Sequence, residues 1–138
     1  MPDGGTTWDM SGGYGGRLLG AIKTHINYIA TEPAKETFNG LNQIANDWGN
    51  QSNLFGTTQR LEIIQSGSED FIPEKESLDL CFTSPPYFDT EKYSNEDTQS
   101  YIRYQDIDSW NKNFLHKALG KMIPTLKEGG ILAINIAD

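Results

Sequence analysis

Basic residues are scarce in this chain. Eleven Lys and Arg face 19 Asp and Glu among 138 residues, which gives a net charge of −8 at neutral pH. Proteins that bind nucleic acid over a broad surface carry an excess of cations, because their contacts with phosphate are electrostatic. Any contact with a polyanion is therefore expected at a small local patch, or through basic surface that another segment or a partner supplies.

Cysteine and long apolar runs are also scarce. The single cysteine, Cys81, excludes an internal disulfide and is expected to be a small buried side chain. No apolar run reaches the roughly 20 residues of a membrane span, and residues 1–5 lack the basic-then-apolar order of a secretion signal. We expect a cytoplasmic protein without membrane contact. His25 and His116 lack the neighbours of a metal site, so no metal is implied.

Short apolar runs alternate with segments of helical periodicity along residues 1–138, which are enough for a single domain. The expected strands are 6–8, 26–31, 61–65, 78–83 and 131–136. The expected helices are 17–22, 34–48 and one marked by apolar residues from 110 to 126, with Asp106 or Asp108 as its cap. This alternation predicts an α/β fold of the Rossmann-like, doubly wound type, with a mostly parallel sheet of about five strands. Ligands of such sheets bind beyond the carboxyl ends of the strands.

The sequence Ser84-Pro85-Pro86-Tyr87 directly follows the fourth expected strand. Two prolines make a stiff turn, while the Ser84 hydroxyl and the Pro85 carbonyl offer two acceptors for the protons of an amino group. Tyr87 offers a flat face on which a base can stack. A proline-rich docking segment is the alternative, but such segments normally lie in disordered sequence. The position after a strand favours an amine-binding clamp.

Polar and glycine residues follow the earlier strands in the same way. Asp9 precedes a glycine-rich turn in which Gly13 and Gly15 allow close approach of a ligand. Glu32 ends the second strand, where a carboxylate can accept both hydroxyls of a ribose. Ser68 and Glu69 follow the third strand and are candidates for binding an adenine amino group. A nicotinamide cofactor would suit the turn and Glu32 equally well, but hydride transfer has no use for an amine clamp.

Taken in order, these segments resemble motifs I to IV of the amino-methyltransferases, which methylate N6 of adenine or N4 of cytosine in DNA. The resemblance implies S-adenosylmethionine as cofactor, a flipped DNA base as substrate and a role such as restriction-modification. It implies catalytic residues Ser84, Pro85, Pro86 and Tyr87, and cofactor-binding residues Asp9, Gly13, Gly15, Glu32, Ser68 and Glu69. Ser at position 84, where many adenine enzymes carry Asp or Asn, resembles the cytosine-N4 branch.

Three alternatives and two departures accompany this resemblance. The alternatives are N6-adenine methylation, methylation of RNA or of a protein amide, and a non-catalytic binding module of the same fold. Family members usually add strands where this chain ends at 137–138, and an element that contacts the methionine end of the cofactor usually precedes motif I, where only about five residues stand here. The family's recognition region also has no counterpart here. We therefore expect the catalytic core of a larger protein, inactive alone on duplex DNA, which contacts DNA through a missing region or a partner subunit.

Residues 88–106 are polar and have no clear period, which predicts a long loop. Phe88, Tyr93 and Arg103 in this stretch are candidates for contacts with the substrate. Each has a simpler interpretation as well, because Phe88 can be plain packing and the other two can belong to a solvated loop.

Overall fold

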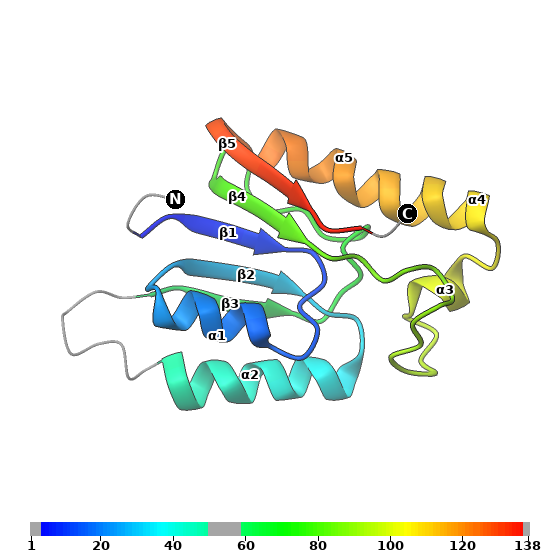
Figure 1. The fold of residues 1–138 in the computed structure, drawn as a ribbon, viewed down its shortest axis with the longest axis horizontal. Coiled ribbons are helices and arrows are strands. Elements are labelled where there is room, and N and C mark those ends of the chain that lie inside the picture. The colour runs from blue at the N-terminus through cyan, green and yellow to red at the C-terminus, as the bar shows by residue number, and fades with distance from the viewer. Residues whose placement is uncertain (1–3, 50–58, 137–138) are drawn as a thin grey trace.

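The computed structural model describes residues 4–49 and 59–136; the predictions concerning residues 1–3 and 137–138 lie outside these ranges. Five parallel strands form one sheet in the order β3-β2-β1-β4-β5 (Figure 1). The strands are β1 (Thr6–Asp9), β2 (Asn27–Thr31), β3 (Leu61–Ile64), β4 (Leu78–Thr83) and β5 (Leu126–Ile134). The predicted fold class and the number of strands are confirmed.

The strand order reverses between β1 and β4. From β1 the chain moves outward to β2 and β3, and it then returns to the other side of β1 to form β4 and β5. β1 and β4 are paired directly, with Trp8 opposite Cys81 and Asp9 opposite Phe82. The connections that leave their carboxyl ends run in opposite directions, and this divergence creates the crevice where ligands of doubly wound sheets bind.

Helices cover both faces of the sheet (Figure 1). On one face lie α1 (Gly16–Lys23) and α2 (Lys35–Gly49); on the other lie α4 (Ile107–Trp110), a π-helical turn η2 (Asn111–Leu115) and α5 (His116–Thr125). Two separate cores result, because successive strand residues point to opposite faces. The α1–α2 core contains Leu18, Tyr28, Ala30 and Leu41; the α5 core contains Trp8, Ile29, Leu78, Phe114 and Met122.

Two local features differ from the prediction and one agrees with it. Of the two expected caps of the long helix, Asp106 is the one used: the helix begins at Ile107, and Asp106 accepts the Ser109 N–H at 2.8 Å. The predicted loop contains a one-turn helix, α3 (Ser100–Arg103). β5 begins at Leu126, and residues 127–130 bulge out of the ladder, which is why the sequence there reads as a turn.

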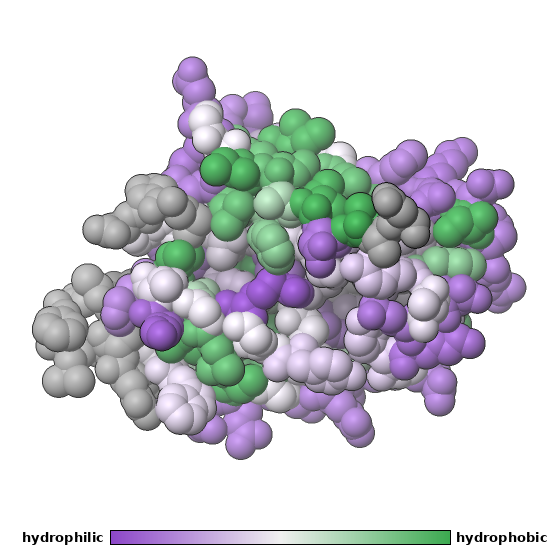
Figure 2. Space-filling view, viewed as in Figure 1, coloured by the Kyte–Doolittle hydropathy of each residue, from purple (hydrophilic) through white to green (hydrophobic). Residues whose placement is uncertain are grey.

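The outer strand β5 carries exposed apolar side chains (Figure 2). Ile131 and Ile134 of this strand are 59% and 39% exposed, and Ile123 of α5 is 65% exposed. Within the described ranges β5 pairs only with β4, so it offers backbone groups to a further strand. None of the helices in the described part of the chain is long and apolar enough to cross a membrane.

Candidate functional site

A cavity of about 220 Å³ lies at the carboxyl ends of the strands. Seven of the predicted site residues line it: Gly13, Glu32, Ser68, Glu69, Ser84, Pro86 and Tyr93. The fold thus brings the predicted cofactor segment and the predicted amine clamp to one cavity, although they are far apart in sequence. The remaining predicted residues, Asp9, Gly15, Pro85, Tyr87, Phe88 and Arg103, are not among the residues that line the cavity, and the role of each predicted residue stays a prediction.

Asp9 is turned into the protein rather than into the cavity. It is 1% exposed, and its Oδ2 accepts the Tyr28 hydroxyl at 2.6 Å and the Arg17 Nε–H. The Ser11 N–H donates to Oδ1 at 3.1 Å. Burial raises the pKa of Asp9 above its ordinary value, while Arg17 and Tyr28 act in the opposite direction. Asp9 therefore fixes the residues on either side of the glycine turn, Ser11 and Arg17, from the protein interior.

The glycine turn needs residues without a Cβ at two positions. Gly13 has φ = 54° and Gly15 has φ = 88°, a region that other residues rarely adopt. A Cβ on Gly15 would lie 2.7 Å from Cδ1 of Ile44, so α1 and α2 pack closely only because that atom is missing. Gly15 directly precedes α1, whose first N–H groups lie near the cavity.

Glu32 fastens the end of β2 to the glycine turn. Its Oε2 accepts the Gly13 N–H at 3.1 Å and its Oε1 accepts the Ala34 N–H at 3.0 Å. The side chain is 8% exposed and lines the cavity, and burial raises its pKa. Each carboxylate oxygen has a second lone pair, so Glu32 can still accept hydroxyl groups from a ligand.

The segment after β3 presents polar atoms of a different kind. Glu69 is 1% exposed; its Oε1 accepts Arg103 Nη1 at 2.5 Å and the Tyr104 hydroxyl at 3.3 Å. Its Oε2 and the Oγ of Ser68, which is 2% exposed, have no hydrogen-bond partner among the described residues. Buried polar groups are normally bonded, so two such atoms in one cavity wall indicate a ligand.

Arg103 faces inward, towards the acidic segment after β3. Besides Glu69, its Nη1 contacts Asp70 Oδ2 at 2.8 Å, and Lys117 Nζ reaches Asp70 Oδ1 at 3.2 Å. Arg103 lowers the pKa of Asp70 by this hydrogen bond. The guanidinium of Arg103, a candidate for contact with the substrate, is thus already bound to Glu69 and Asp70.

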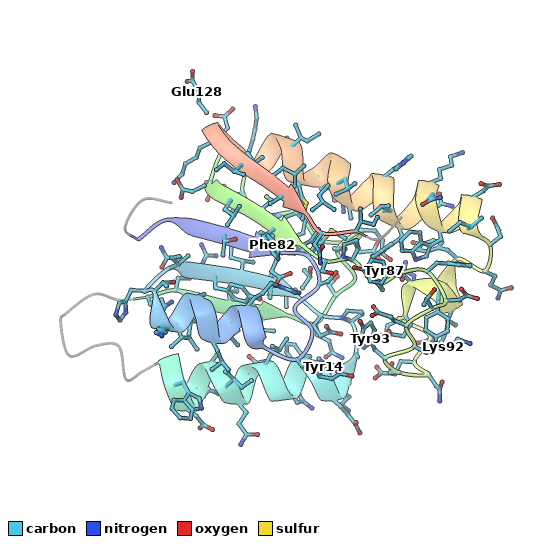
Figure 3. All side chains as sticks on the ribbon, in the orientation of Figure 1. Tyr14, Phe82, Tyr87, Lys92, Tyr93 and Glu128 are labelled. Atoms are coloured by element: carbon cyan, nitrogen blue, oxygen red, sulfur yellow. The ribbon has the colours of Figure 1, made fainter. Side chains whose placement is uncertain are left out.

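The clamp follows β4 directly. Asn135, just beyond β5, donates its Nδ2–H to Ser84 Oγ at 3.3 Å, and its backbone N–H donates to the Thr83 carbonyl at 2.8 Å. Asn135 thereby orients the Ser84 hydroxyl, a role that the sequence analysis did not foresee. Tyr87 is half-buried beyond the end of β4 (Figure 3).

The segment after the clamp crosses the cavity towards α2. Tyr93 packs edge-on against Tyr14 of the glycine turn, with ring centres 6.0 Å apart (Figure 3). The Glu96 carboxylate accepts the N–H of Lys35, the first residue of α2, at 3.1 Å. Phe88 instead packs against Trp110, also at 6.0 Å, in agreement with its simpler interpretation. The loop therefore closes one side of the cavity.

Sequence reasoning missed Arg17 and Gln99, which both line the cavity. A cation immediately after a glycine turn in an acidic chain was a usable signal for Arg17. For Gln99 the sequence offered none, because the residue stands in a stretch without periodicity. Gln99 is 6% exposed, and its Nε2 has no hydrogen-bond partner within residues 4–49 and 59–136.

Neither a protein-family model nor a curated protein matches this sequence. Solved structures do resemble the fold. A protein from Pyrococcus horikoshii superimposes with a TM-score of 0.66 at 13% identity over 97% of this chain. An rRNA methylase from Streptococcus thermophilus gives 0.64 at 17% over 99%, and an S-adenosylmethionine-dependent methyltransferase from Methanococcus maripaludis gives 0.60 at 19% over 96%.

The chain covers 50%, 63% and 48% of those three proteins, so it spans about half of the length of the first and third. At these identities the likeness concerns the fold. The five-stranded parallel sheet with helices on both faces is the Rossmann-like fold of S-adenosylmethionine-dependent methyltransferases.

Proposed function

We propose that the protein binds S-adenosylmethionine and methylates the exocyclic amino group of a DNA base, with N4 of cytosine as the favoured target. The observation that carries this proposal is the shared cavity: Ser84 and Pro86 of the clamp line the same space as Gly13, Glu32 and Glu69. A methyl donor and an amine acceptor must meet in one water-poor space for transfer to occur.

The residues present fit the proposed cofactor. Glu32 can accept the hydroxyls of a ribose, and the partnerless Ser68 Oγ and Glu69 Oε2 described above are acceptors suited to an adenine amino group. Arg17 also lies in the cavity wall, beside the glycine turn, where its guanidinium is paired with Asp9. When bound, S-adenosylmethionine supplies an electrophilic methyl group carried on a sulfonium.

The clamp would act on the amine that receives the methyl group. The Ser84 hydroxyl and the Pro85 carbonyl would accept hydrogen bonds from its two N–H groups, which favours a pyramidal nitrogen and stabilises the positive charge that develops there; the one surplus proton then leaves to water. Asn135 occupies one lone pair of Ser84 Oγ and so limits where the hydroxyl can point. Tyr87 would hold the flat base after it leaves its stack.

The surface around the cavity entrance is acidic. Residues 88–108 contain six carboxylates and two cations, Lys92 and Arg103. Arg103 is bound to Glu69 and Asp70, and Lys92 lies over the ring of Tyr101 at 5.8 Å. A duplex would meet like charge here, so we propose that DNA is held by a partner or a further region and that a base already unpaired is the easier substrate.

Transfer of a labelled methyl group tests the proposal. The chain is incubated with labelled S-adenosylmethionine and single-stranded DNA, duplex DNA, RNA or protein, and labelled DNA is digested to nucleosides for mass analysis. We expect N4-methylcytosine from single-stranded DNA, strongly reduced in Ser84→Ala and in Tyr87→Ala.

Tyr87→Ala removes a stacking face worth about 1–3 kcal/mol and should weaken base capture without changing cofactor affinity. Label in N6-methyladenine alone would contradict the cytosine assignment but would not contradict the proposed role of the clamp. Label in RNA or protein alone would contradict the DNA assignment. Cofactor binding without any transfer would support a non-catalytic module.

A further inference from the structure

Three residues that line one cavity each bury a polar side-chain atom without a partner: Ser68 Oγ, Glu69 Oε2 and Gln99 Nε2 have no hydrogen-bond partner in the described part of the chain. We call them the open atoms. Each side chain is more than nine-tenths buried. Two of them are acceptor groups that follow β3, while the third is an amide donor from the segment before α3. The cavity thus offers acceptors and a donor together.

The backbone of Gln99 is fixed on both sides. Its N–H donates to the Glu96 carbonyl at 3.1 Å, and its own carbonyl accepts the N–H groups of Ile102 and Arg103 at 3.1 and 3.0 Å. These backbone bonds fix the position from which the Gln99 side chain starts, which reduces the ordering cost of binding a ligand.

Neighbouring contacts place Gln99 between the ends of β2 and β3. Thr98, one residue before it, donates its hydroxyl to the Pro33 carbonyl at 3.3 Å. Arg103, four residues after it, binds Glu69 Oε1. The segment of Gln99 therefore bridges Pro33 and Glu69, which line the cavity together with Gln99.

We infer that Gln99 and Glu69 together read the edge of a 6-aminopurine, with Glu69 Oε2 accepting from the amino group and Gln99 Nε2 donating to an adjacent ring nitrogen. This inference rests on the proposed function and adds to it, because it assigns Gln99 to the adenine of the cofactor. Adenine presents this amino donor beside a ring acceptor on each of two edges, through N1 or through N7.

The hydrogen bonds that Glu69 already accepts favour adenine over guanine as the ligand. A carboxylate that reads guanine must use both oxygens, one for N1–H and one for the 2-amino group. Oε1 of Glu69 is already bound by Arg103 and Tyr104, so only Oε2 remains for a ligand. One acceptor beside one donor matches the amino group and ring nitrogen of adenine.

Calorimetric titration of three proteins with four ligands tests the inference. The ligands are S-adenosylhomocysteine, its 1-deaza and 7-deaza analogues, and S-inosylhomocysteine, in which a carbonyl oxygen replaces the amino group. The proteins are wild type, Gln99→Leu and the matched control Gln105→Leu, which changes an exposed glutamine of the same segment. Circular dichroism and thermal melting confirm that each variant is folded.

We expect wild type to bind one deaza analogue about tenfold more weakly than S-adenosylhomocysteine, because one neutral hydrogen bond to a buried donor is lost. In Gln99→Leu that difference should vanish, while Gln105→Leu should behave as wild type. S-inosylhomocysteine should bind at least about 100-fold more weakly to wild type, because its carbonyl oxygen faces Glu69 Oε2.

The outcomes separate this inference from the proposed function. Absence of binding by wild type overturns both. Tight binding of S-adenosylhomocysteine together with equal affinity for both deaza analogues overturns the role of Gln99 and leaves the cofactor assignment standing. That comparison uses only wild-type protein, so it holds even where Gln99→Leu fails to fold.

Discussion

The two sides of the cavity satisfy their polar atoms in opposite ways. On the side of β1 and β2, Asp9 and Glu32 are bound by groups of the chain itself: the Tyr28 hydroxyl, Arg17 and three backbone N–H groups. On the side of β3 and α3, the open atoms are buried without partners in the described ranges. The first side is thus held in shape before any ligand enters, and the second becomes complete only with one.

This contrast separates stability from binding. Bonds formed within the chain contribute to the free energy of unfolding, whereas a buried polar atom without a partner costs roughly 1–3 kcal/mol. Substitutions on the β1–β2 side should therefore destabilise the protein. Substitutions of Ser68 and Gln99 should leave the free protein equally or more stable and weaken ligand binding; Glu69 differs, because its other oxygen binds Arg103 and Tyr104.

Asp9→Ala should produce the largest loss of stability. It leaves the Arg17 guanidinium, which is 34% exposed, without its carboxylate, and it also frees the Tyr28 hydroxyl. Breaking a buried pair costs about 3–5 kcal/mol, and partial exposure of Arg17 reduces the expected loss to about 2–4 kcal/mol. Urea unfolding measures it, with Asp79→Ala as the control because Asp79 pairs with the more exposed Lys127. A loss below that of the control would contradict the contrast.

Gly15→Ala should come next. The substitution forces a residue with a Cβ into φ = 88° and brings that Cβ to 2.7 Å from Ile44 Cδ1. We expect a loss of about 1–3 kcal/mol in the free energy of unfolding. Gly20→Ala is the matched control: it lies within α1 with open space at its Cβ position, and should stabilise the protein by about 0.5–1 kcal/mol. Equal effects of the two changes would show that the turn is not constrained.

Ser68→Ala should show the reverse behaviour. It removes a buried hydroxyl that lacks a partner in the described ranges, so the unfolding free energy should stay unchanged or rise by up to about 1 kcal/mol. Affinity for S-adenosylhomocysteine should fall by about threefold to tenfold. Ser66→Ala serves as the control, because the Ser66 hydroxyl donates to the Gly67 carbonyl at 2.9 Å and its loss should cost stability. Clear destabilisation by Ser68→Ala would mean that its hydroxyl is bonded within the chain.

Asp70→Asn should have the smallest effect, and one that depends on pH. Arg103 lowers the folded-state pKa of Asp70 below the value of about 3.9 for an unfolded chain. The pair therefore stabilises the protein above about pH 4, and this contribution is lost as pH falls through the folded-state pKa. Because Asp70 is 43% exposed, we expect at most about 0.5–1 kcal/mol at pH 7. Unfolding by urea at pH 7 and pH 3 should show the difference shrinking; a constant difference would exclude the ion pair as its cause.

The sequence predicted the sheet well because strands and helices there depend on local patterns. Apolar runs such as 78–83 and the helical spacing of 34–48 are visible in the residues themselves, and they became β4 and α2. The positions after strands followed from the general rule for parallel sheets, which is why Gly13, Glu32 and Ser84 meet at one cavity.

What the sequence missed depends on contacts between distant segments. α3 lies in a stretch without period, and its position is fixed by Arg103 on Glu69 and by the Trp110 indole donating to Ser100 Oγ at 3.0 Å. Gln99 faces the cavity only because of these contacts. Asn135 likewise reaches Ser84 through the pairing of β5 with β4, which no local pattern reveals.

Calorimetric titration of the wild-type chain with S-adenosylhomocysteine, and in parallel with NAD, tests the central claim most directly. The account predicts saturable binding of one S-adenosylhomocysteine per chain and much weaker binding of NAD, which offers the same adenine and ribose but adds a charged pyrophosphate to a cavity lined by Glu32 and Glu69. Binding of NAD alone would contradict the assignment, and so would the absence of saturable binding of S-adenosylhomocysteine by folded protein.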